Sequence, residues 1–447
     1  MLKRKIDDIL LKWKAEPNHK PIVIKGCRQC GKTFSVQKFA KDNYPHVVYI
    51  NFMLNPDYAM AFEGSKLTDD IVINITAMIS GSVFVPQQTC LILDEIQECP
   101  AARTALKFFK TDGRYDVIAT GSLLGVKGYG NHSRKTNEEY SKTSIPVGYE
   151  TIVDMYPLDF EEFLWANGIT SPVIDKIKEC FMLEQPVPEA LHRRFRQLIL
   201  QYTVVGGMPA VVSLFLQNHD LGRVLEEQRN IIAEYEDDMV KYANESDKPR
   251  IRECFESIPQ QLSKENKKFQ YTLVRKNSKA SQYQGSLQWI EDAGIINRCH
   301  NLNITELPLD GNSIPDIFKV YMTDTGLFVS MLEDGTQFDI LQGNLYGYKG
   351  AIFENLIADI FTKMKRKLYY FRKDSGLEVD FVIRYKGACV LVEVKAKDGN
   401  TKSTKTILSH PDKYHVYQAI KLGDYNVGKS GAILTLPLYM AFLLNSY

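Results

Sequence analysis

The stretch IKGCRQCGKTFS, residues 24–35, decides the fold of the first part of the chain, and it contains two overlapping patterns. The first is G-x-x-x-x-G-K-T from Gly26 to Thr33, in which glycines allow a loop to curl around phosphate groups at the start of a helix. The second is C-x-x-C at Cys27 and Cys30, which occurs in redox and zinc sites. A structural zinc site needs a second close pair of Cys or His ligands, and the sequence has none at suitable spacing. We therefore interpret the stretch as a phosphate-binding loop.

The sequence around this loop alternates between strand-like and helix-like segments. PIVIKG (21–26) is an apolar run of strand length, and TFSVQKFAKDN (33–43) has the pattern of a helix. Further apolar runs at 46–52, 89–95 and 115–122 are each followed by helical or polar sequence. Strands that alternate with helices predict an α/β fold, in which a parallel sheet is covered by helices on both faces.

The loop and a later strand predict how ATP and Mg²⁺ are bound. In loops of this kind Lys32 reaches the β- and γ-phosphates and the hydroxyl of Thr33 binds Mg²⁺. The run CLILDEIQ (90–97) predicts a buried strand that ends in two carboxylates, at the edge of the sheet where ligands bind. We expect Asp94 to hold Mg²⁺ through water and Glu95 to orient and polarise the attacking water. The residues predicted to bind the nucleotide are Gly26, Cys27, Arg28, Gln29, Cys30, Gly31, Lys32, Thr33 and Asp94.

A third run, DVIATGS (116–122), ends in small hydroxyl side chains. Thr120 and Ser122 are placed to contact the γ-phosphate or the attacking water, although such residues at strand ends often only cap the next helix. We predict a catalytic role for Ser122 together with Lys32 and Glu95.

Six motifs follow one another along nearly the whole chain: GCRQCGKT, LILDEIQ, IATGSLLG, SIPVGYETIVDMYPLDFEEFL, YTVVGGMPAVV and MTDTGLF. Together they resemble a widespread family of prokaryotic AAA-type ATPases that carry a C-terminal domain of unknown function. The resemblance implies an AAA-type core in which Gly26–Thr33 is Walker A, Asp94 and Glu95 are Walker B and Ser122 is the sensor position. The loop of that family commonly reads G-A-R-Q-V-G-K-T, so the two cysteines here stand at variable positions.

One departure from the family concerns an arginine finger. Many relatives have a basic residue after the glycine of PVG, whereas this chain has Tyr149. If the basic residue acts as a finger or sensor, that role falls here to another arginine, and Arg103, Arg114 and Arg134 are candidates. AAA-type modules often assemble so that one subunit supplies this arginine to its neighbour, which makes a homo-oligomer an open alternative.

Changes in pattern along the chain predict four regions. They are a P-loop AAA-type ATPase domain (1–165), a helical region (166–245), a basic winged-helix-like domain (246–335) and a nuclease-like α/β domain (345–447). Residues 126–144 are polar and contain glycines, so we expect a mobile surface loop there.

The region 246–280 is locally basic, with nine Lys or Arg residues against four acidic residues. A basic helix pair followed by a short hairpin suits a winged-helix domain, and clustered cations suit DNA phosphates. The alternative is a solvated basic face on a packing domain. The formal net charge of the whole chain is only +1, so overall basicity gives no argument for nucleic acid.

The stretch GLEVDFVIRYKGACVLVEVKA (376–396) predicts two strands joined by a turn at RYKGA. Because side chains alternate along a strand, Glu378 and Asp380 should share one face, and Glu393 and Lys395 one face of the next strand. Glu354, on a preceding amphipathic helix, could add a ligand. Two carboxylates and a lysine beside Mg²⁺ suit phosphodiester hydrolysis.

This order of residues resembles the PD-(D/E)xK nuclease core, an α/β restriction-endonuclease-like fold. The resemblance implies that Asp380, Glu393 and Lys395 are catalytic and that Glu354, Asp380 and Glu393 hold a second Mg²⁺. Such folds also persist as binding modules, so the residues alone do not establish cleavage.

Composition sets the remaining expectations. The chain has 44% hydrophobic and 24% charged residues, no stretch of about 18 uncharged apolar residues and no signal-peptide pattern. Its eight scattered cysteines favour reduced thiols, so we predict a cytoplasmic protein without a membrane segment. The predicted function is Mg²⁺-dependent ATP hydrolysis coupled to a nuclease-like domain that acts on DNA. The alternative is an ATPase switch or scaffold whose C-terminal domain only binds a protein or nucleic-acid partner.

Overall fold

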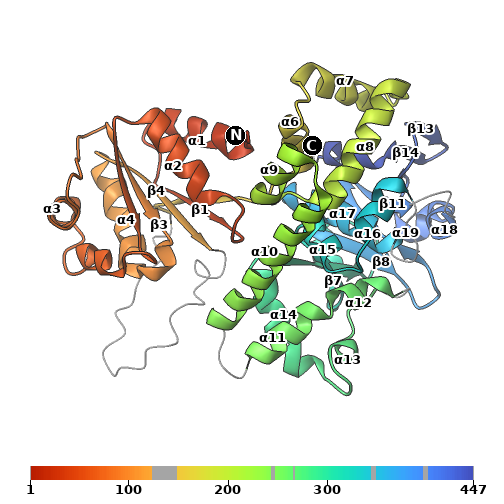
Figure 1. Cartoon of the computed structure of the whole chain (residues 1–447). Coiled ribbons are helices and arrows are strands. Elements are labelled where there is room, and N and C mark those ends of the chain that lie inside the picture. The colour runs from red at the N-terminus through yellow and green to blue at the C-terminus, as the bar shows by residue number, and fades with distance from the viewer. Residues whose placement is uncertain are drawn as a thin grey trace. The chain divides into compact units, whose positions relative to one another are not determined.

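The computed structural model (Figure 1) describes residues 2–122, 148–242, 247–264, 267–343, 349–395 and 401–445. The chain divides into two compact units. The first unit is Lys3–Pro157 with the short piece Asp292–Gly294, and the second unit is the rest of the chain. The boundary therefore follows Pro157, whereas we placed one near residue 165. The surface loop expected at 126–144, with Arg134, lies outside the described residues.

The first unit contains a five-stranded sheet in which all neighbouring strands are parallel, in the order β2-β3-β4-β1-β5. The strands are β1 (Ile22–Gly26), β2 (His46–Asn51), β3 (Thr89–Asp94), β4 (Asp116–Ser122) and β5 (Thr151–Asp154). The main helices are α1 (Lys5–Ala15), α2 (Lys32–Asn43), α3 (Thr68–Met78) and α4 (Pro100–Asp112), with short 3-10 helices η1 (Pro56–Phe62) and η2 (Ile96–Glu98). The strands predicted from the apolar runs are all present, so the parallel α/β fold is confirmed.

Helices cover both faces of this sheet (Figure 1). Neighbouring residues of a strand point to opposite faces, so Ile22 packs with the core cluster of α1 and α2, and Val23 packs with the cluster of α3 and α4. In β3, Cys90 and Ile92 likewise belong to the first cluster and Leu91 to the second. A strand that is buried on both faces has to be apolar throughout, which explains why the runs lack alternating polar residues.

The register of the sheet brings the carboxyl ends of four strands to one edge. Gly26, the last residue of β1, pairs with Ser122, the last residue of β4. Asn51, the last residue of β2, pairs with Asp94, the last residue of β3. The residues that follow these strands are therefore collected at a single edge, as ligand binding requires in folds of this class.

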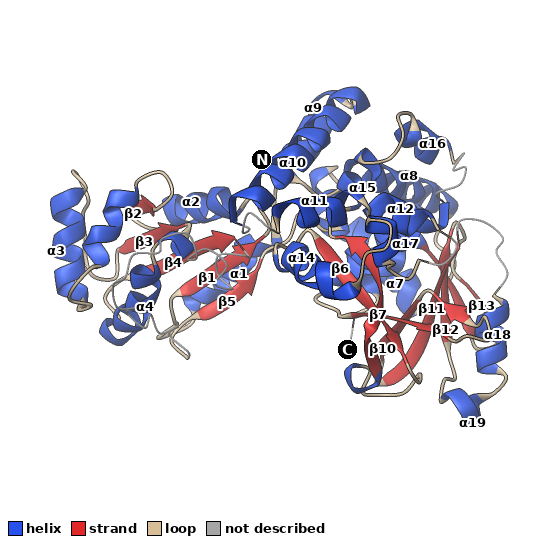
Figure 2. Cartoon of the chain, turned by 90° about the horizontal axis from the view of Figure 1, so that it is seen from below, coloured by secondary structure: helices blue, strands red, loops and turns tan. Residues whose placement is uncertain are grey.

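The second unit begins with helices and continues with two mixed sheets (Figure 2). Its helices up to the first sheet strand are α6 (Phe160–Ala166), α7 (Ser171–Met182), α8 (Glu189–Val205), α9 (Pro209–Asn218), α10 (Leu221–Tyr242), α11 (Lys248–Glu256), α12 (Ile258–Ser263), α13 (Tyr271–Val274) and α14 (Ala280–Asp292). The later helices are η3 (Asp310–Asn312), α15 (Thr325–Ser330), α16 (Thr336–Gln342), α17 (Lys349–Lys363), α18 (Lys402–Leu408), α19 (Pro411–Tyr414) and η4 (Leu438–Leu443). The helical middle of the chain is thus as expected.

One sheet of this unit has the order β7-β6-β8-β9 and the other has the order β10-β11-β12-β14-β13. The strands are β6 (Ile296–Leu302), β7 (Ser313–Met322), β8 (Leu368–Arg372), β9 (Glu378–Val379), β10 (Phe381–Tyr385), β11 (Ala388–Lys395), β12 (Ala419–Gly423), β13 (Gly428–Ser430) and β14 (Ile433–Pro437). Strand β6 pairs antiparallel with β7 and parallel with β8. The hairpin expected after the basic helices is therefore present, but it shares a sheet with a strand of the region predicted as the nuclease-like domain.

The strand predicted to carry Glu378 and Asp380 is interrupted at Asp380. Its first part, β9, pairs with β8, and its second part, β10, forms the expected hairpin with β11. If the register of that hairpin continued, the backbone of β9 would meet Val394. Instead the Asp380 carboxylate accepts a hydrogen bond from the Val394 N–H at 2.8 Å. This side-chain bond takes the place of a backbone bond, so the chain can leave one sheet and enter the other.

The start of α15 packs very closely against the end of α8. A Cβ atom at Gly326 would lie 2.5 Å from the Gly206 nitrogen and 2.6 Å from the Val205 carbonyl oxygen. These are backbone atoms of a helix end, so the structure has little room to adjust. In contrast, Gly285 is exposed in the interior of α14, and a Cβ atom there meets nothing within 4 Å.

We expect Gly326→Ala to lower the free energy of unfolding by about 1–3 kcal/mol or more, because of overpacking. Gly285→Ala is the matched control, and we expect it to raise stability by about 0.5–1 kcal/mol, since alanine favours a helix interior. Urea unfolding followed by tryptophan fluorescence can compare the two variants, because Trp165 and Trp289 both lie in the second unit. Equal effects of the two substitutions would contradict this account.

Candidate functional site

The phosphate-binding loop connects β1 to α2 and has the backbone that its glycines predict. Gln29 and Gly31 have positive φ angles of 61° and 95°, so the loop turns back toward the N-terminus of α2. A Cβ atom at Gly26 would lie 2.2 Å from the carbonyl oxygen of Met155, at the end of β5. Only glycine fits there, because any side chain would push the loop away from the sheet.

Lys32 lies at the start of α2 and is buried. Its ammonium group donates hydrogen bonds to the carbonyl oxygens of Gly26, at 3.1 Å, and Cys27, at 2.8 Å. The lysine is thus held over the loop, at the helix N-terminus where anions are stabilised. The role of Lys32 as the cation that meets the phosphates remains a prediction.

The two residues predicted to hold Mg²⁺ are in direct contact. The Thr33 hydroxyl lies 3.0 and 3.2 Å from the two carboxylate oxygens of Asp94, and Asp94 is only 2% exposed. Tyr49 and Asn51 also donate to this carboxylate, at 2.7 and 3.1 Å, and the Thr120 hydroxyl bonds it as well. Carboxylate and hydroxyl oxygens are ligands that Mg²⁺ prefers, so these residues fit that ion.

Sequence reasoning missed Tyr49 and Asn51. Both lie on β2, and the pairing of Asn51 with Asp94 in the parallel ladder brings them to the site. Their only signal in the sequence is their position near the end of a predicted strand, HVVYINF, because strand ends of a parallel sheet collect at one edge.

Glu95 and Ser122 lie at the same edge of the sheet. Glu95 follows β3 directly and has a φ angle of 54°, in the left-handed region that glutamate rarely adopts. One of its carboxylate oxygens accepts a hydrogen bond from the Gln97 amide at 2.5 Å. Ser122 is buried at the end of β4, opposite Gly26 in the ladder. Strained backbone of this kind is concentrated at functional sites, and here it turns Glu95 out of the strand.

The arginines proposed as fingers have partners within the first unit. Arg103 forms an ion pair with Glu150 at 2.9 Å, and Arg114 forms ion pairs with Asp69 and Asp112 at 2.5 and 2.6 Å. The third candidate, Arg134, lies outside the described residues.

A different arginine, Arg4, supports the phosphate-binding loop and was not expected from the sequence. Its guanidinium group donates to the carbonyl oxygens of Cys30, at 2.9 Å, and Tyr156, at 2.7 Å. Arg4 lies just before α1, far from the loop in the sequence, and only 7% of its surface is exposed. No local pattern marks such a residue, because its role depends on a long-range contact.

Cys27 and Cys30 are buried in the core beneath the loop rather than facing a ligand. The Cys30 thiol contacts the Met155 carbonyl oxygen at 3.5 Å. A hydrogen bond with the Cys27 side chain, together with the charges of Lys32 and Arg4, lowers the pKa of Cys30 to about 6, against the effect of burial. All eight cysteines are free thiols.

Three of the four residues predicted for the C-terminal site, Asp380, Glu393 and Lys395, lie close together. The Lys395 ammonium lies 2.7 Å from a Glu393 oxygen and 3.6 Å from an Asp380 oxygen. The other Glu393 oxygen accepts a hydrogen bond from the Thr404 hydroxyl at 2.6 Å. Burial, together with the carboxylates of Glu354 and Glu393, raises the pKa of Asp380 to about 7. The carboxylates are therefore close enough to influence one another.

The fourth residue, Glu354, is held by bases that the sequence did not indicate. It forms ion pairs with Lys267 and with Lys319, the latter at 3.7 Å, and it accepts a hydrogen bond from the Tyr321 hydroxyl at 3.0 Å. Burial alone would raise its pKa, but Lys319 and Lys267 lower it. Within the part of the chain that the structure describes, no group of three or more His, Cys, Asp or Glu residues is placed to hold a metal ion. In this arrangement Glu354 is paired with two lysines, and its role as a metal ligand remains a prediction.

Several residues of the predicted basic region also have acidic partners. Arg250 lies 3.8 Å from Asp247, and Arg275 lies 3.7 Å from Glu253. With Lys267 bound to Glu354, part of the positive charge counted in the sequence is neutralised within the unit. Direct DNA contact by this region remains a prediction.

Three family models match separate parts of the chain. Residues 18–164 match the model of an AAA domain. The first part of the chain is an AAA domain. Residues 196–337 and 349–439 match two domains of unknown function, DUF8612 and DUF4143. The AAA domain contains the phosphate-binding loop, Asp94, Glu95 and Ser122, so this part of the chain is of the AAA-type P-loop ATPase class.

Solved structures that match the chain are distant from it in sequence. A Walker-type ATPase of Pyrococcus abyssi is 13% identical, over 74% of this chain and 96% of its own, with a TM-score of 0.43. The ORC1 protein of Aeropyrum pernix, in complex with DNA, is 11% identical over 74% and 91%, with a TM-score of 0.28. AMPPCP-bound DnaA of Aquifex aeolicus is 13% identical over 64% and 87%, with a TM-score of 0.27.

No curated protein sequence matches the chain significantly. In the described part of the chain, no helix has the length and apolar character needed to cross a bilayer.

We expect the double substitution Cys27→Ala with Cys30→Val to leave nucleotide binding nearly intact, because both side chains are buried below the loop and its backbone faces the phosphates. The affinity for a fluorescent ATP analogue should change less than about threefold, which corresponds to less than about 0.7 kcal/mol. A tenfold or greater loss of affinity would contradict the interpretation that these two positions only fill space below the loop. It would indicate a direct role of the cysteines in nucleotide binding.

Proposed function

We propose that the AAA domain binds ATP with Mg²⁺ and hydrolyses it at the edge of the sheet formed by β1, β3 and β4. The observation that carries the proposal is the contact of Thr33 with the buried Asp94 carboxylate, beside the loop that holds Lys32. These are the residues that a P-loop ATPase needs for phosphate and metal, and their placement does not depend on one motif alone.

Each residue of the site has a distinct role in the proposed reaction. The Lys32 ammonium exchanges its loop carbonyl partners for phosphate oxygens and stabilises their charge. Thr33 and Asp94 would hold Mg²⁺, which neutralises the charge that develops on the phosphates. Glu95 orients and polarises the attacking water. The Ser122 hydroxyl donates a hydrogen bond to the γ-phosphate or to that water.

We expect Lys32→Ala to weaken binding of ATP by about 10- to 100-fold, the effect of losing a charged hydrogen bond. Glu95→Gln should retain binding and lower the rate of hydrolysis by about 100-fold or more. Lys41→Ala is the matched control, because Lys41 is exposed in the last turn of the same helix. Binding of a labelled ATP analogue and release of phosphate measure the two quantities. Full hydrolysis in both site variants would refute the assignment.

For the second unit, we propose that ATP hydrolysis controls the cluster of Asp380, Glu393 and Lys395, which acts on DNA. The order of elements supports the proposal, because it is that of an α/β fold, as expected for a nuclease-like domain. Helix α17 precedes β8, β10 and β11, and β12 then pairs parallel with β11. Further support is the contact of Lys395 with both carboxylates, as phosphodiester hydrolysis requires of a lysine that stabilises charge.

A second candidate function is a switch whose C-terminal region binds a partner without cleaving it. The balance of charge at the cluster favours this candidate. Four acids, Glu354, Glu378, Asp380 and Glu393, are paired with four bases, Lys267, Lys319, Arg372 and Lys395. A cluster that is neutral by its own residues attracts a divalent cation less than one with excess negative charge.

Cleavage of supercoiled and linear DNA with Mg²⁺ separates the two candidates. If the first is correct, the wild-type protein cuts DNA, and both Asp380→Ala and Lys395→Ala remove cleavage. The exposed Asp374, near the same strand, gives the matched control Asp374→Ala, which should cut as the wild type does. If the wild-type protein binds labelled DNA but does not cut it, the switch is the better description.

A further inference from the structure

The segment Met155–Leu158, which joins β5 to α6, is bound at its start to the phosphate-binding loop. The Met155 carbonyl oxygen accepts the Cys30 thiol at 3.5 Å and lies 2.2 Å from the position of a Cβ atom on Gly26. The next carbonyl, that of Tyr156, accepts the Arg4 guanidinium at 2.7 Å, and Arg4 also binds the Cys30 carbonyl oxygen at 2.9 Å. The start of the segment and the phosphate-binding loop are therefore held to each other by direct contacts.

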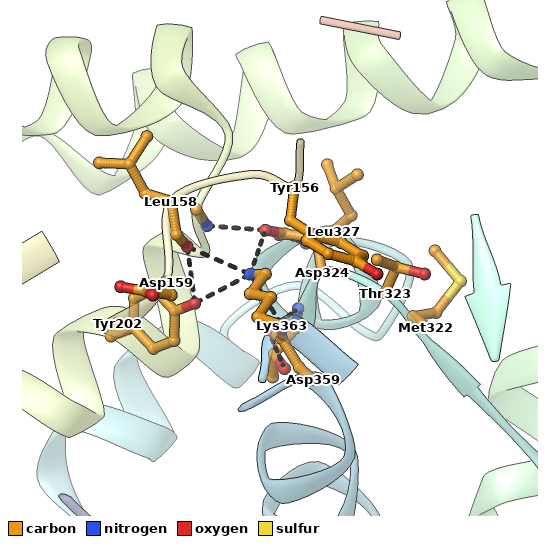
Figure 3. A network of polar contacts seen from close by, with 12 residues as sticks. Tyr156, Leu158, Asp159, Tyr202, Met322, Thr323, Asp324, Leu327, Asp359 and Lys363 are labelled. Atoms are coloured by element: carbon orange, nitrogen blue, oxygen red, sulfur yellow. Dashed lines mark hydrogen bonds and ion pairs between the residues drawn. The ribbon is translucent and has the colours of Figure 1, made fainter. Parts of the chain in front are cut away.

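The end of the segment is bound just as firmly, within the second unit (Figure 3). The Leu158 N–H donates to the Gly207 carbonyl oxygen at 2.7 Å. The Leu158 carbonyl oxygen accepts the Tyr202 hydroxyl at 2.8 Å and the Lys363 ammonium at 3.2 Å. A Cβ atom on Gly207 would lie 2.1 Å from that oxygen, so the contact leaves no room for adjustment.

Behind Leu158 lies a buried network of charges from three helices. The Lys363 side chain, at the end of α17, is 1% exposed and forms ion pairs with Asp359 at 2.7 Å and with Asp324 at 3.8 Å. It also donates to the Tyr202 hydroxyl, near the end of α8, at 2.9 Å. Asp324, the N-cap of α15, accepts the Gly207 N–H at 2.7 Å. Buried charges are costly to leave unpaired, so this network resists deformation.

The network unites residues from three of the sequence motifs described above that the ATP site does not use. Leu158 belongs to YPLDF, Tyr202 and Gly207 belong to YTVVGGMP, and Asp324 belongs to MTDTGLF. Between the two ends, Pro157 restricts one backbone angle, and the connection is only four residues long.

We propose that Met155–Leu158 is a coupling strap, through which the occupancy of the phosphate-binding loop sets the state of α8, α15 and α17. Arg4 and Tyr202 are positioning residues at its two ends. In this proposal, Lys32 exchanges its bonds to the carbonyl oxygens of Gly26 and Cys27 for bonds to phosphate, which loosens the part of the loop that Met155 contacts. Because the two ends are coupled, a substitution that loosens the strap at Leu158 should in turn change nucleotide affinity. The inference rests on the proposed binding of ATP.

The test is a double-mutant cycle on the affinity of the full chain for a non-hydrolysable ATP analogue. Tyr202→Phe removes the hydroxyl that binds Leu158, and we expect it to change affinity by about 5-fold or more, a typical coupling effect. In the Arg4→Met background, where the strap has lost the guanidinium link between the Tyr156 and Cys30 carbonyl oxygens, the same change should have an effect of less than about 2-fold. Tyr283→Phe is the control, because the Tyr283 hydroxyl binds Glu253 outside the network, and it should leave affinity unchanged.

A second measurement compares the unmodified chain with and without the ATP analogue, so its main result does not depend on the folding of a variant; Lys32→Ala serves only as the control. The ATP analogue should change hydrogen exchange at the N–H groups of Leu158 and Gly207, and Lys32→Ala should abolish that change. Two results would overturn the strap if the analogue binds tightly. The first is that Tyr202→Phe leaves the affinity unchanged, and the second is that the analogue leaves hydrogen exchange at Leu158 and Gly207 unchanged. Equal effects of Tyr202→Phe with and without Arg4 would overturn it too. A wild-type protein that does not bind the analogue would overturn the proposed function itself.

Discussion

The carboxylate of Asp94 is buried at the end of β3, and much of the AAA domain is arranged to make that burial possible. A buried charge without partners is too costly to persist, so hydroxyl and amide donors from β2, β4 and α2 converge on it. They can converge because parallel strands end together at one edge of the sheet. The same edge then supplies the glycine loop, Glu95 and Ser122.

The second unit has a buried charge of the opposite sign, the Lys363 ammonium. It is satisfied by two carboxylates, a tyrosine hydroxyl and a backbone carbonyl oxygen, which come from segments far apart in the sequence. Glycines at 206, 207 and 326 allow these segments to approach closely. In each unit, therefore, one buried charged side chain is contacted by the elements around it, and in the second unit glycines allow those elements to come close enough.

The sequence predicted the AAA domain well because its information is local. A glycine loop between a strand and a helix, and an apolar run ending in Asp94 and Glu95, are each readable within a few residues. Arg4, Tyr49, Lys267 and Lys319 were missed because their roles arise from contacts across tens of residues or more. The interruption at Asp380 was missed for a related reason, since a side chain replaces a backbone bond and alternation along the sequence is unchanged.

The parallel pairing of β6 with β8 limits where the second unit can be cut into fragments that keep their sheets intact. A fragment that ends near residue 343 would retain the β6–β7 hairpin but lose β8, so β6 would expose unpaired N–H and C=O groups along one side. Exposed strand edges promote association with other chains. Middle and C-terminal regions that match two different family models thus share one sheet, and insolubility of either piece would reflect a missing strand rather than a lack of intrinsic order.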